Sequence, residues 1–137
     1  MRAILAMALL LAAAPASAAT LTVRITGVVK AEGMLRIAVC NRSFDEQGCP
    51  HGASKAAVVP GRDVQFLDLA PGSYAVAVYQ DLDGSGELNR NGLGLPTEPY
   101  GFSNDVGRIA PPSFSGALFE LSGDRTIEIR VRPLFGG

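Results

Sequence analysis

Apolar and polar residues alternate in short runs along most of the chain. Segments 21–26 and 35–39 place Leu, Val or Ile at every second position. Because successive side chains of a β-strand point to opposite faces, this period of two predicts strands with one buried face. Glu32-Gly33 lies between the two runs and favours a turn. We therefore expect the two strands to form a hairpin that ends at Cys40.

Three later segments continue the alternation, at 64–69, 74–78 and 127–131. Pro71-Gly72, between the first two, is the strongest turn signal in the chain. In 74–78, large Tyr and Val residues alternate with small Ala residues. That composition is typical of a central strand covered on both faces.

The pattern as a whole predicts an all-β protein. No helix is expected in residues 19–137, and strands do not alternate with helices. About seven short strands separated by turns are typical of an antiparallel β-sandwich, which we expect residues 19–137 to form as a single domain. One long irregular stretch, 84–113, is rich in Gly, Asn and Pro, and ordered stretches of this kind commonly carry function.

Residues 1–18 have the three-part order of a cleavable secretory signal peptide. Arg2 precedes an apolar run at 4–14, and residues 16–18 supply the small side chains that a signal peptidase needs. The apolar run is shorter than the about 20 residues that span a bilayer. We expect cleavage after Ala18 and a periplasmic or secreted protein, with no transmembrane segment in the mature chain. The alternative is an uncleaved anchor or an amphipathic helix.

The charge composition limits the partners of the protein. The chain has 12 basic and 13 acidic residues and a formal net charge of −1. Proteins that bind nucleic acid or anionic membranes electrostatically carry a basic excess, which this composition lacks. We expect neither partner, and an envelope or extracellular ligand, protein or carbohydrate, is expected instead.

The chain has two cysteines, Cys40 and Cys49. In an oxidising compartment a pair this close predicts a disulfide, which here would close a small loop at the end of a strand. The alternative is a reactive cysteine that works with His51. No third group is placed to orient such a pair, so the disulfide is favoured.

The segment 81–92, DLDGSGELNRNG, resembles a twelve-residue calcium-binding loop. Gly86 stands where such loops turn sharply. A hard divalent cation is bound by oxygen atoms, which alternate residues of a turning loop can direct to one centre. The candidate ligands are Asp81, Asp83, Ser85, the Glu87 backbone carbonyl and Asn89. The alternative is a tight polar turn, which favours the same residue types.

The loop departs from the calcium pattern at its twelfth position, which is Gly92 and not the usual Glu. Glu98, Asp105 or water would have to complete the coordination. The affinity expected of such a site is weak, with a dissociation constant of about 0.1 to 1 mM. A metal-dependent hydrolase is a further alternative, in which Glu87 or Glu98 acts as a base.

The segment that follows, LPTEPYGFSNDVG, combines aromatic, amide and carboxylate side chains. Loops that hold a sugar or a peptide often have this composition. The candidate ligand-binding residues are Glu98, Tyr100, Phe102, Asn104 and Asp105. The alternative is that the two rings fold back and cover the open edge of the sandwich.

Three sequence features together carry a family resemblance. They are Pro71-Gly-x-Tyr74, the Asp-rich loop that begins at Asp81, and G-x-P-x-E-x-Y-G-F-S-N at 94–104. The chain resembles a bacterial family of small exported proteins catalogued as a domain of unknown function. The segment 66–81 is also similar to transthyretin-like and carboxypeptidase-regulatory-like sandwich domains, which are mostly binding, spacer or stabilising modules.

The resemblance implies a transthyretin-like sandwich and supplies no substrate, because a fold does not determine a function. We expect a non-enzymatic binding module that holds a ligand or partner in the 81–105 loop, with calcium as the candidate cofactor and no catalytic residue. A structural accessory of the cell envelope is the alternative.

Overall fold

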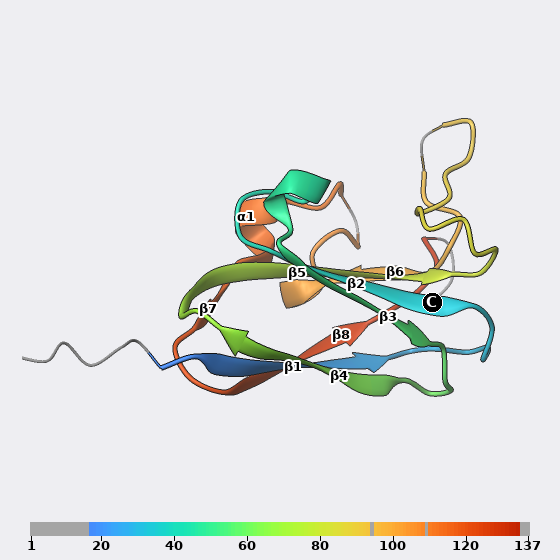
Figure 1. Ribbon diagram of the computed structural model, residues 1–137. Helices are drawn as coiled ribbons and strands as arrows, with labels where there is room; N and C mark the ends of the chain where they lie inside the picture. Colours follow the sequence, from blue (N-terminus) through green and yellow to red (C-terminus); the bar gives the residue numbers. More distant parts are fainter. Residues whose placement is uncertain (1–16, 94, 109, 135–137) are drawn as a thin grey trace, which may run out of the picture.

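The computed structural model describes residues 17–93, 95–108 and 110–134. Their strands are β1 (Ala19–Thr26), β2 (Met34–Cys40), β3 (His51–Ala56), β4 (Arg62–Leu69), β5 (Gly72–Asp81), β6 (Tyr100–Phe102), β7 (Phe119–Leu121) and β8 (Arg125–Arg130). One sheet has three strands in the order β4-β1-β8, and the other has five, β3-β2-β5-β6 with β7 also paired to β5. The two sheets stack face to face, so the protein is a β-sandwich as predicted (Figure 1).

The predicted signal peptide, 1–18, lies outside the described residues except for its last two, and it stays a prediction. Among the residues that the structure describes, no helix is both long and apolar enough to cross a membrane.

Apolar side chains of the two sheets meet in the space between them. In β1, Leu21, Val23 and Ile25 are at most 1% exposed. Alternate residues of β2 and β5 belong to the same buried cluster from the facing sheet. The period-two pattern therefore predicted the core strands correctly, and β5 is central, with β2 on one side and β6 and β7 on the other.

The expected hairpin of the first two strands is wrong. β1 pairs with β4 and β8, whereas β2 pairs with β3 and β5 in the other sheet. The connection 27–33 crosses between the sheets, and the Gln80 side-chain amide donates to the carbonyl oxygens of Lys30 and Glu32, both at 2.8 Å. A strand shows the same alternation whether it pairs with its neighbour or packs against it, so the pattern could not separate the two arrangements.

The sandwich is not antiparallel throughout, because β1 and β8 pair in parallel. A parallel pair needs a crossover connection, and here most of the chain lies between the two strands. The backbone N–H of Thr20 also donates to Asp124, 104 residues away in sequence, at 2.9 Å. The first described strand, β1, is therefore bonded along its length to the last one, β8.

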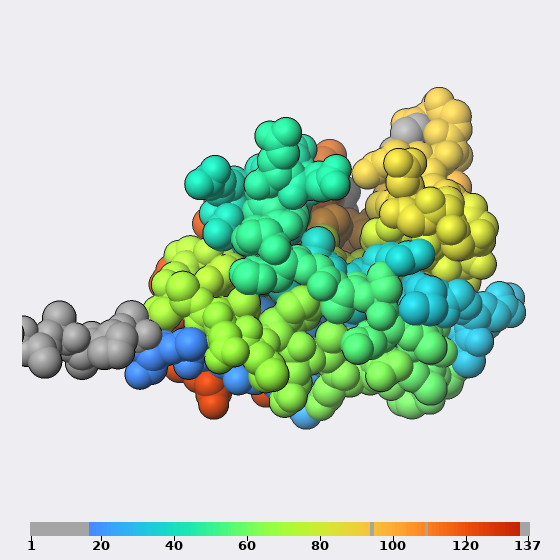
Figure 2. All heavy atoms as spheres, viewed as in Figure 1, coloured from blue at the N-terminus to red at the C-terminus, as the bar shows by residue number. Residues whose placement is uncertain are grey.

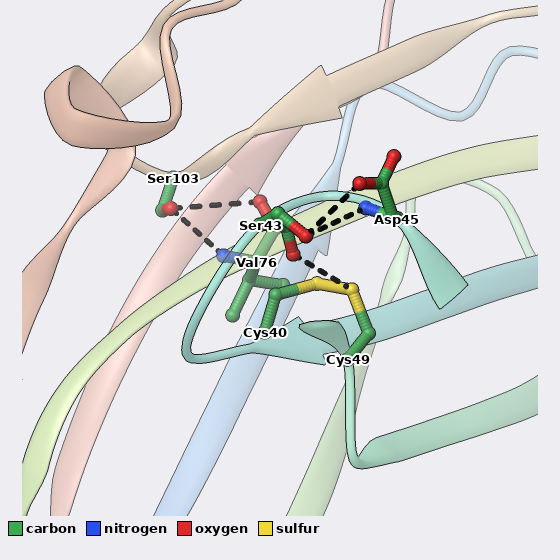
Figure 3. The surroundings of a disulfide bond; sticks show 6 residues. All are labelled: Cys40, Ser43, Asp45, Cys49, Val76 and Ser103. Atoms are coloured by element: carbon green, nitrogen blue, oxygen red, sulfur yellow. Dashed lines mark hydrogen bonds between the residues drawn. A yellow bond between two sulfur atoms is a disulfide. The ribbon is translucent and has the colours of Figure 1, made fainter. Parts of the chain in front are cut away.

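The elements missed from the sequence include β3, β6 and α1, since none of them has an informative periodicity. β6 lies within the stretch 84–113, which was expected to be irregular. β3 is exposed along nearly all of its length, so it has no apolar face. The helix α1 (Phe114–Ala117) is a single turn, capped by Ser113, whose hydroxyl accepts from Gly116 N at 3.2 Å. The buried Ser103 hydroxyl accepts from Val76 N at 2.9 Å (Figure 3). It also donates to Ala117 O at 2.6 Å, which fixes α1 to β5.

Two projections stand on the outer face of the five-stranded sheet (Figures 1 and 2). We call residues 41–48 the disulfide loop, drawn in teal, and residues 82–99 the acidic loop, drawn in yellow. Figure 2 shows a hollow between them. Its lining includes Phe44, Ala77 and Tyr79.

The predicted disulfide joins Cys40, the last residue of β2, to Cys49. It closes the disulfide loop, in which the Ser43 hydroxyl and the backbone N–H and carboxylate of Asp45 hydrogen-bond at 3.3 Å (Figure 3). The loop also forms backbone hydrogen bonds to Gly48. The bond therefore closes a short segment that has its own internal contacts.

Replacing both cysteines by alanine should lower the free energy of unfolding by about 2 to 3 kcal/mol, because a closed loop of about ten residues restricts the unfolded chain by that amount. Urea denaturation of the oxidised protein, the reduced protein and the double variant measures the effect. The reduced protein and the variant should agree. Equal stability of the oxidised and reduced protein would contradict the expected contribution.

Candidate functional site

Asp81, the last residue of β5, is completely buried although it lies on the outer face of the sheet. Arg36, on the neighbouring strand β2, lies beside it, with Nε at 3.1 Å and Nη2 at 3.0 Å from Asp81 Oδ2. The third guanidinium nitrogen donates to Ser54 on β3 at 2.7 Å. Removing a carboxylate from water costs several kcal/mol unless it is paired, so this contact permits its burial.

The acidic loop turns immediately after Asp81 and returns its own N–H groups to that carboxylate. Ser85 N donates to Oδ1 at 3.1 Å, and Gly86 N donates to Oδ2 at 2.8 Å. Gly84 and Gly86 have φ values of 70° and 78°, a region that glycine enters without steric cost. The Tyr79 hydroxyl donates to Gly86 O at 2.7 Å and holds this turn against the sheet.

The five groups predicted as cation ligands form one cluster of oxygen atoms. Ser85 Oγ lies 2.8 Å from Glu87 O, 3.2 Å from Asn89 Oδ1 and 3.5 Å from Asp81 Oδ1. The Asn89 amide donates to Asp83 Oδ2. A hydroxyl has one proton, so Ser85 can donate to only one of its three acceptors. The oxygen atoms around Ser85 Oγ therefore outnumber the protons that this hydroxyl can donate.

Glu98 reaches the same cluster from the far end of the acidic loop and is only 2% exposed. Its Oε2 accepts from Leu82 N at 2.6 Å, and its Oε1 accepts from Asn89 N at 2.8 Å. Carboxylate oxygens of Asp81, Asp83 and Glu98 all lie within 4.8 Å of one another. These three residues could hold a metal ion, and Glu98 supplies a carboxylate that the twelfth position of the loop lacks.

The electrostatics of the cluster favour a cation. Three carboxylates lie together, and Arg36 pairs with one of them, that of Asp81. Hydrogen bonds from the Asn89 side chain and the Ser85 backbone lower the pKa of Asp83 to about 2, so this carboxylate stays ionised in all but strong acid. Burial, and then the charge of Asp81, raise the pKa of Tyr79.

The other predicted ligand-binding residues do not join the acidic cluster. Tyr100 is 8% exposed, and its hydroxyl donates to Gly107 O at 3.0 Å. The ring of Phe102 packs 5.0 Å from Phe44, which in turn packs edge-on against Phe114 at 5.2 Å. Tyr100 and Phe102 thus make packing contacts on the outer face of the sheet, whereas the packing alternative placed the two rings over the open edge of the sandwich.

Asn104 and Asp105 make structural contacts next to these rings. The Asn104 amide donates to two carbonyls around α1, those of Gly116 at 3.0 Å and Leu118 at 2.9 Å. Asp105 pairs with Arg132 at 3.0 Å and with Arg108 at 3.3 Å. Asp105 is therefore engaged by arginines, and Glu98 is the additional carboxylate found at the acidic cluster.

Arg36 is the residue of the site that sequence reasoning missed. It occupies an outward position in an alternating run, where a charged residue normally faces solvent. Its partner Asp81 is 45 residues away in sequence. No local spacing could have indicated the pair.

A protein-family profile described as "Uncharacterized protein conserved in bacteria (DUF2141)" matches residues 23–129. The matched range extends from β1 to β8 and includes the whole acidic loop. No curated protein and no solved structure matches the chain.

Replacing Arg36 by methionine should lower the free energy of unfolding by about 2 to 3 kcal/mol, because it leaves the buried Asp81 carboxylate without its cationic partner. Arg24→Met is the matched control, since the side chains of Arg24 and its partner Asp63 are 53% and 47% exposed and their contact is open to solvent. Urea denaturation compares the two. Equal losses in the free energy of unfolding would show that the buried Arg36–Asp81 pair contributes no more than the exposed Arg24–Asp63 pair.

Asn89→Ala should raise the pKa of Asp83 from about 2 toward its ordinary value of 3.8, because the Asn89 hydrogen bond is the largest cause of the lowering. A lowered folded-state pKa stabilises the protein above the ordinary value, and that contribution is lost as the pH falls through about 2. Carboxyl-carbon NMR titration measures the change. The pKa of Asp63, lowered by Arg24, should stay constant as the control.

Proposed function

The chain belongs to DUF2141, a family of uncharacterized bacterial proteins, and from its site we propose that it is an exported, non-enzymatic binding module. In this proposal the 81–105 loop holds a ligand or partner, and calcium organises the loop. The observation that carries the proposal is the cluster in which Asp81, Asp83 and Glu98 converge with oxygen atoms of Ser85 and Asn89.

Calcium suits this cluster because its candidate ligand atoms are all oxygens. Ca²⁺ takes six to eight oxygen ligands in variable geometry, whereas Mg²⁺ requires a near-ideal octahedron and retains water. The hydrogen bonds that Asp81 already accepts from Arg36 and the loop compete with a metal for its lone pairs. We therefore expect a weak site, with a dissociation constant of about 0.1 to 1 mM.

The arrangement supports binding better than general-base catalysis. An efficient base has a pKa near the working pH, whereas the pKa of Asp83 is about 2. Both oxygens of Glu98 accept backbone N–H groups, which fix the carboxylate in the acidic loop. Hydrolysis would require Glu87 or Glu98 to act on water beside an ion, and it remains the alternative from the enzyme class.

Export to the periplasm or the outside of the cell is part of the same proposal. Residues 1–18 have the order of a signal peptide. The Cys40–Cys49 disulfide is a bond that persists in oxidising compartments. Weak calcium sites of the extracellular kind are useful only where calcium reaches the millimolar range.

Calcium should raise the thermal midpoint of the protein without its leader by several degrees. A ligand at about 100 times its dissociation constant adds about 2.7 kcal/mol to the free energy of unfolding, and about 10 mM calcium reaches that ratio for a 0.1 mM site. Scanning fluorimetry with calcium, magnesium and a chelator measures the shift. Unchanged midpoints would reject the cation part of the proposal.

Asp83→Ala should reduce this calcium-dependent shift, and Glu46→Ala should not. Asp83 is one of the three clustered carboxylates, whereas Glu46 is an exposed acidic residue in the disulfide loop. Both variants remove one negative charge, so the comparison separates a local site from general attraction. Equal shifts in the two variants would show that calcium binds elsewhere.

A further inference from the structure

Two neighbouring hollows lie beside β6, outside the acidic cluster. Each has a volume of about 300 Å³, and they share a wall formed by Tyr100, Gly107, Arg108 and Leu134. This volume lies at the lower end of the range for small-molecule sites. We call the two hollows together the β6 cleft.

One half of the β6 cleft is cationic. Arg108, Arg130 and Arg132 line it, and Asp105 is the one acidic residue of its lining. Asp105 pairs with Arg132 and Arg108, which leaves two positive charges in excess. The side chain of Arg130 forms no hydrogen bond or ion pair with any residue that the structure describes. Guanidinium groups bind carboxylates in a bidentate geometry, so this half suits an anionic group.

The other half of the β6 cleft is mainly apolar, with arginines at its boundary. Arg90 and Arg108 contribute to its lining, and the remainder consists of glycine, apolar or aromatic residues: Leu88, Leu95, Pro96, Tyr100, Phe102, Gly107, Ala110, Pro111, Pro112 and Leu134. One wall is the arm of the acidic loop, held by Asn91 N to Leu95 O at 2.9 Å and Thr97 N to Asn89 O at 2.8 Å.

The acidic cluster and the β6 cleft share this loop. Asn89 is a predicted cation ligand, and Leu88 and Arg90, its neighbours in sequence, line the apolar half of the cleft. Glu98, which stands two residues before Tyr100, accepts a hydrogen bond from Asn89 N. An ion in the acidic cluster would therefore fix the wall against which a ligand packs.

We propose that the β6 cleft binds a small amphiphilic carboxylate. The carboxylate lies against Arg108, Arg130 and Arg132. The aliphatic body packs against Leu88, Leu95, Pro96 and 110–112. The charge complementarity of one half and the apolar lining of the other support this occupant. The inference rests on the proposed function, since it names the ligand class that the 81–105 loop holds.

Octanoate is compared with two matched probes. Acetate has the carboxylate without the long alkyl chain, and octanol has the alkyl chain without the carboxylate. Isothermal titration calorimetry should give octanoate at least about tenfold tighter binding than either, since the buried methylenes and the hydrogen bonds to the charged group both contribute. Acetate that binds as well as octanoate, or octanol that does so, would overturn the inference. Absence of octanoate binding would also overturn it.

Two variants locate the site. Arg130→Gln should weaken octanoate binding about tenfold, and because its side chain has no polar partner among the described residues, its thermal midpoint should stay close to that of the parent. Arg42→Gln, an exposed arginine of the disulfide loop, removes the same charge and should have no effect. Leu95→Ser should weaken octanoate while acetate is unaffected, with the exposed Leu67→Ser on β4 as its control. Equal losses from a variant and its control would place binding elsewhere.

Two further measurements distinguish failure of the carboxylate proposal from failure of the proposed cation site. Octanoate binding is measured with and without calcium beside the calcium-dependent thermal shift. A calcium shift without octanoate binding would reject the carboxylate ligand and leave the cation site standing, and the reverse result would reject only the cation site. Binding to vesicles that contain phosphatidylglycerol is also measured. Binding to these vesicles but not to octanoate would identify a membrane surface as the ligand and would overturn the proposal of a free carboxylate.

Discussion

The contact on which the rest of the site depends is that between Arg36 and the buried Asp81. β5 ends with a carboxylate that has no access to solvent, and a buried charge is stable only when its lone pairs are satisfied. Arg36 meets part of this need from the neighbouring strand, and the N–H groups of Ser85 and Gly86 meet the rest. The path of the chain just after the strand is thus fixed by one desolvated side chain, and the oxygen cluster follows from that path.

The sequence predicted those features of the fold that repeat locally. The alternation in 21–26, 35–39 and 74–78 showed which residues face the core, because burial and period two are linked within a single strand. It could not show which strands pair, since that depends on contacts between distant segments, and the expected hairpin was therefore wrong. β3 was missed for a related reason, because an edge strand without an apolar face leaves no periodic signal.

In the candidate site too, local spacing predicted some residues, and contacts between distant segments determined the others. The oxygen groups from Asp81 to Asn89 were predicted from spacing because one turn brings them together. Glu98 was one of several ways to complete the cluster, and only the fold distinguishes it from Asp105, which pairs with arginines. Tyr100, Phe102 and Asp105, candidate ligand-binding residues from the sequence, line the β6 cleft. Arg36 and the arginines of the cleft were not foreseen, because they come from strands and loops far apart in the sequence.

The parallel pairing of β1 with β8 has a consequence for how the protein is made. The three-stranded sheet holds its first strand at the centre, between β4 and β8. Until β8 has left the ribosome, one edge of β1 has no partner, and closing so long a loop is slow. The three-stranded sheet therefore stays incomplete for nearly the whole of the synthesis of the chain.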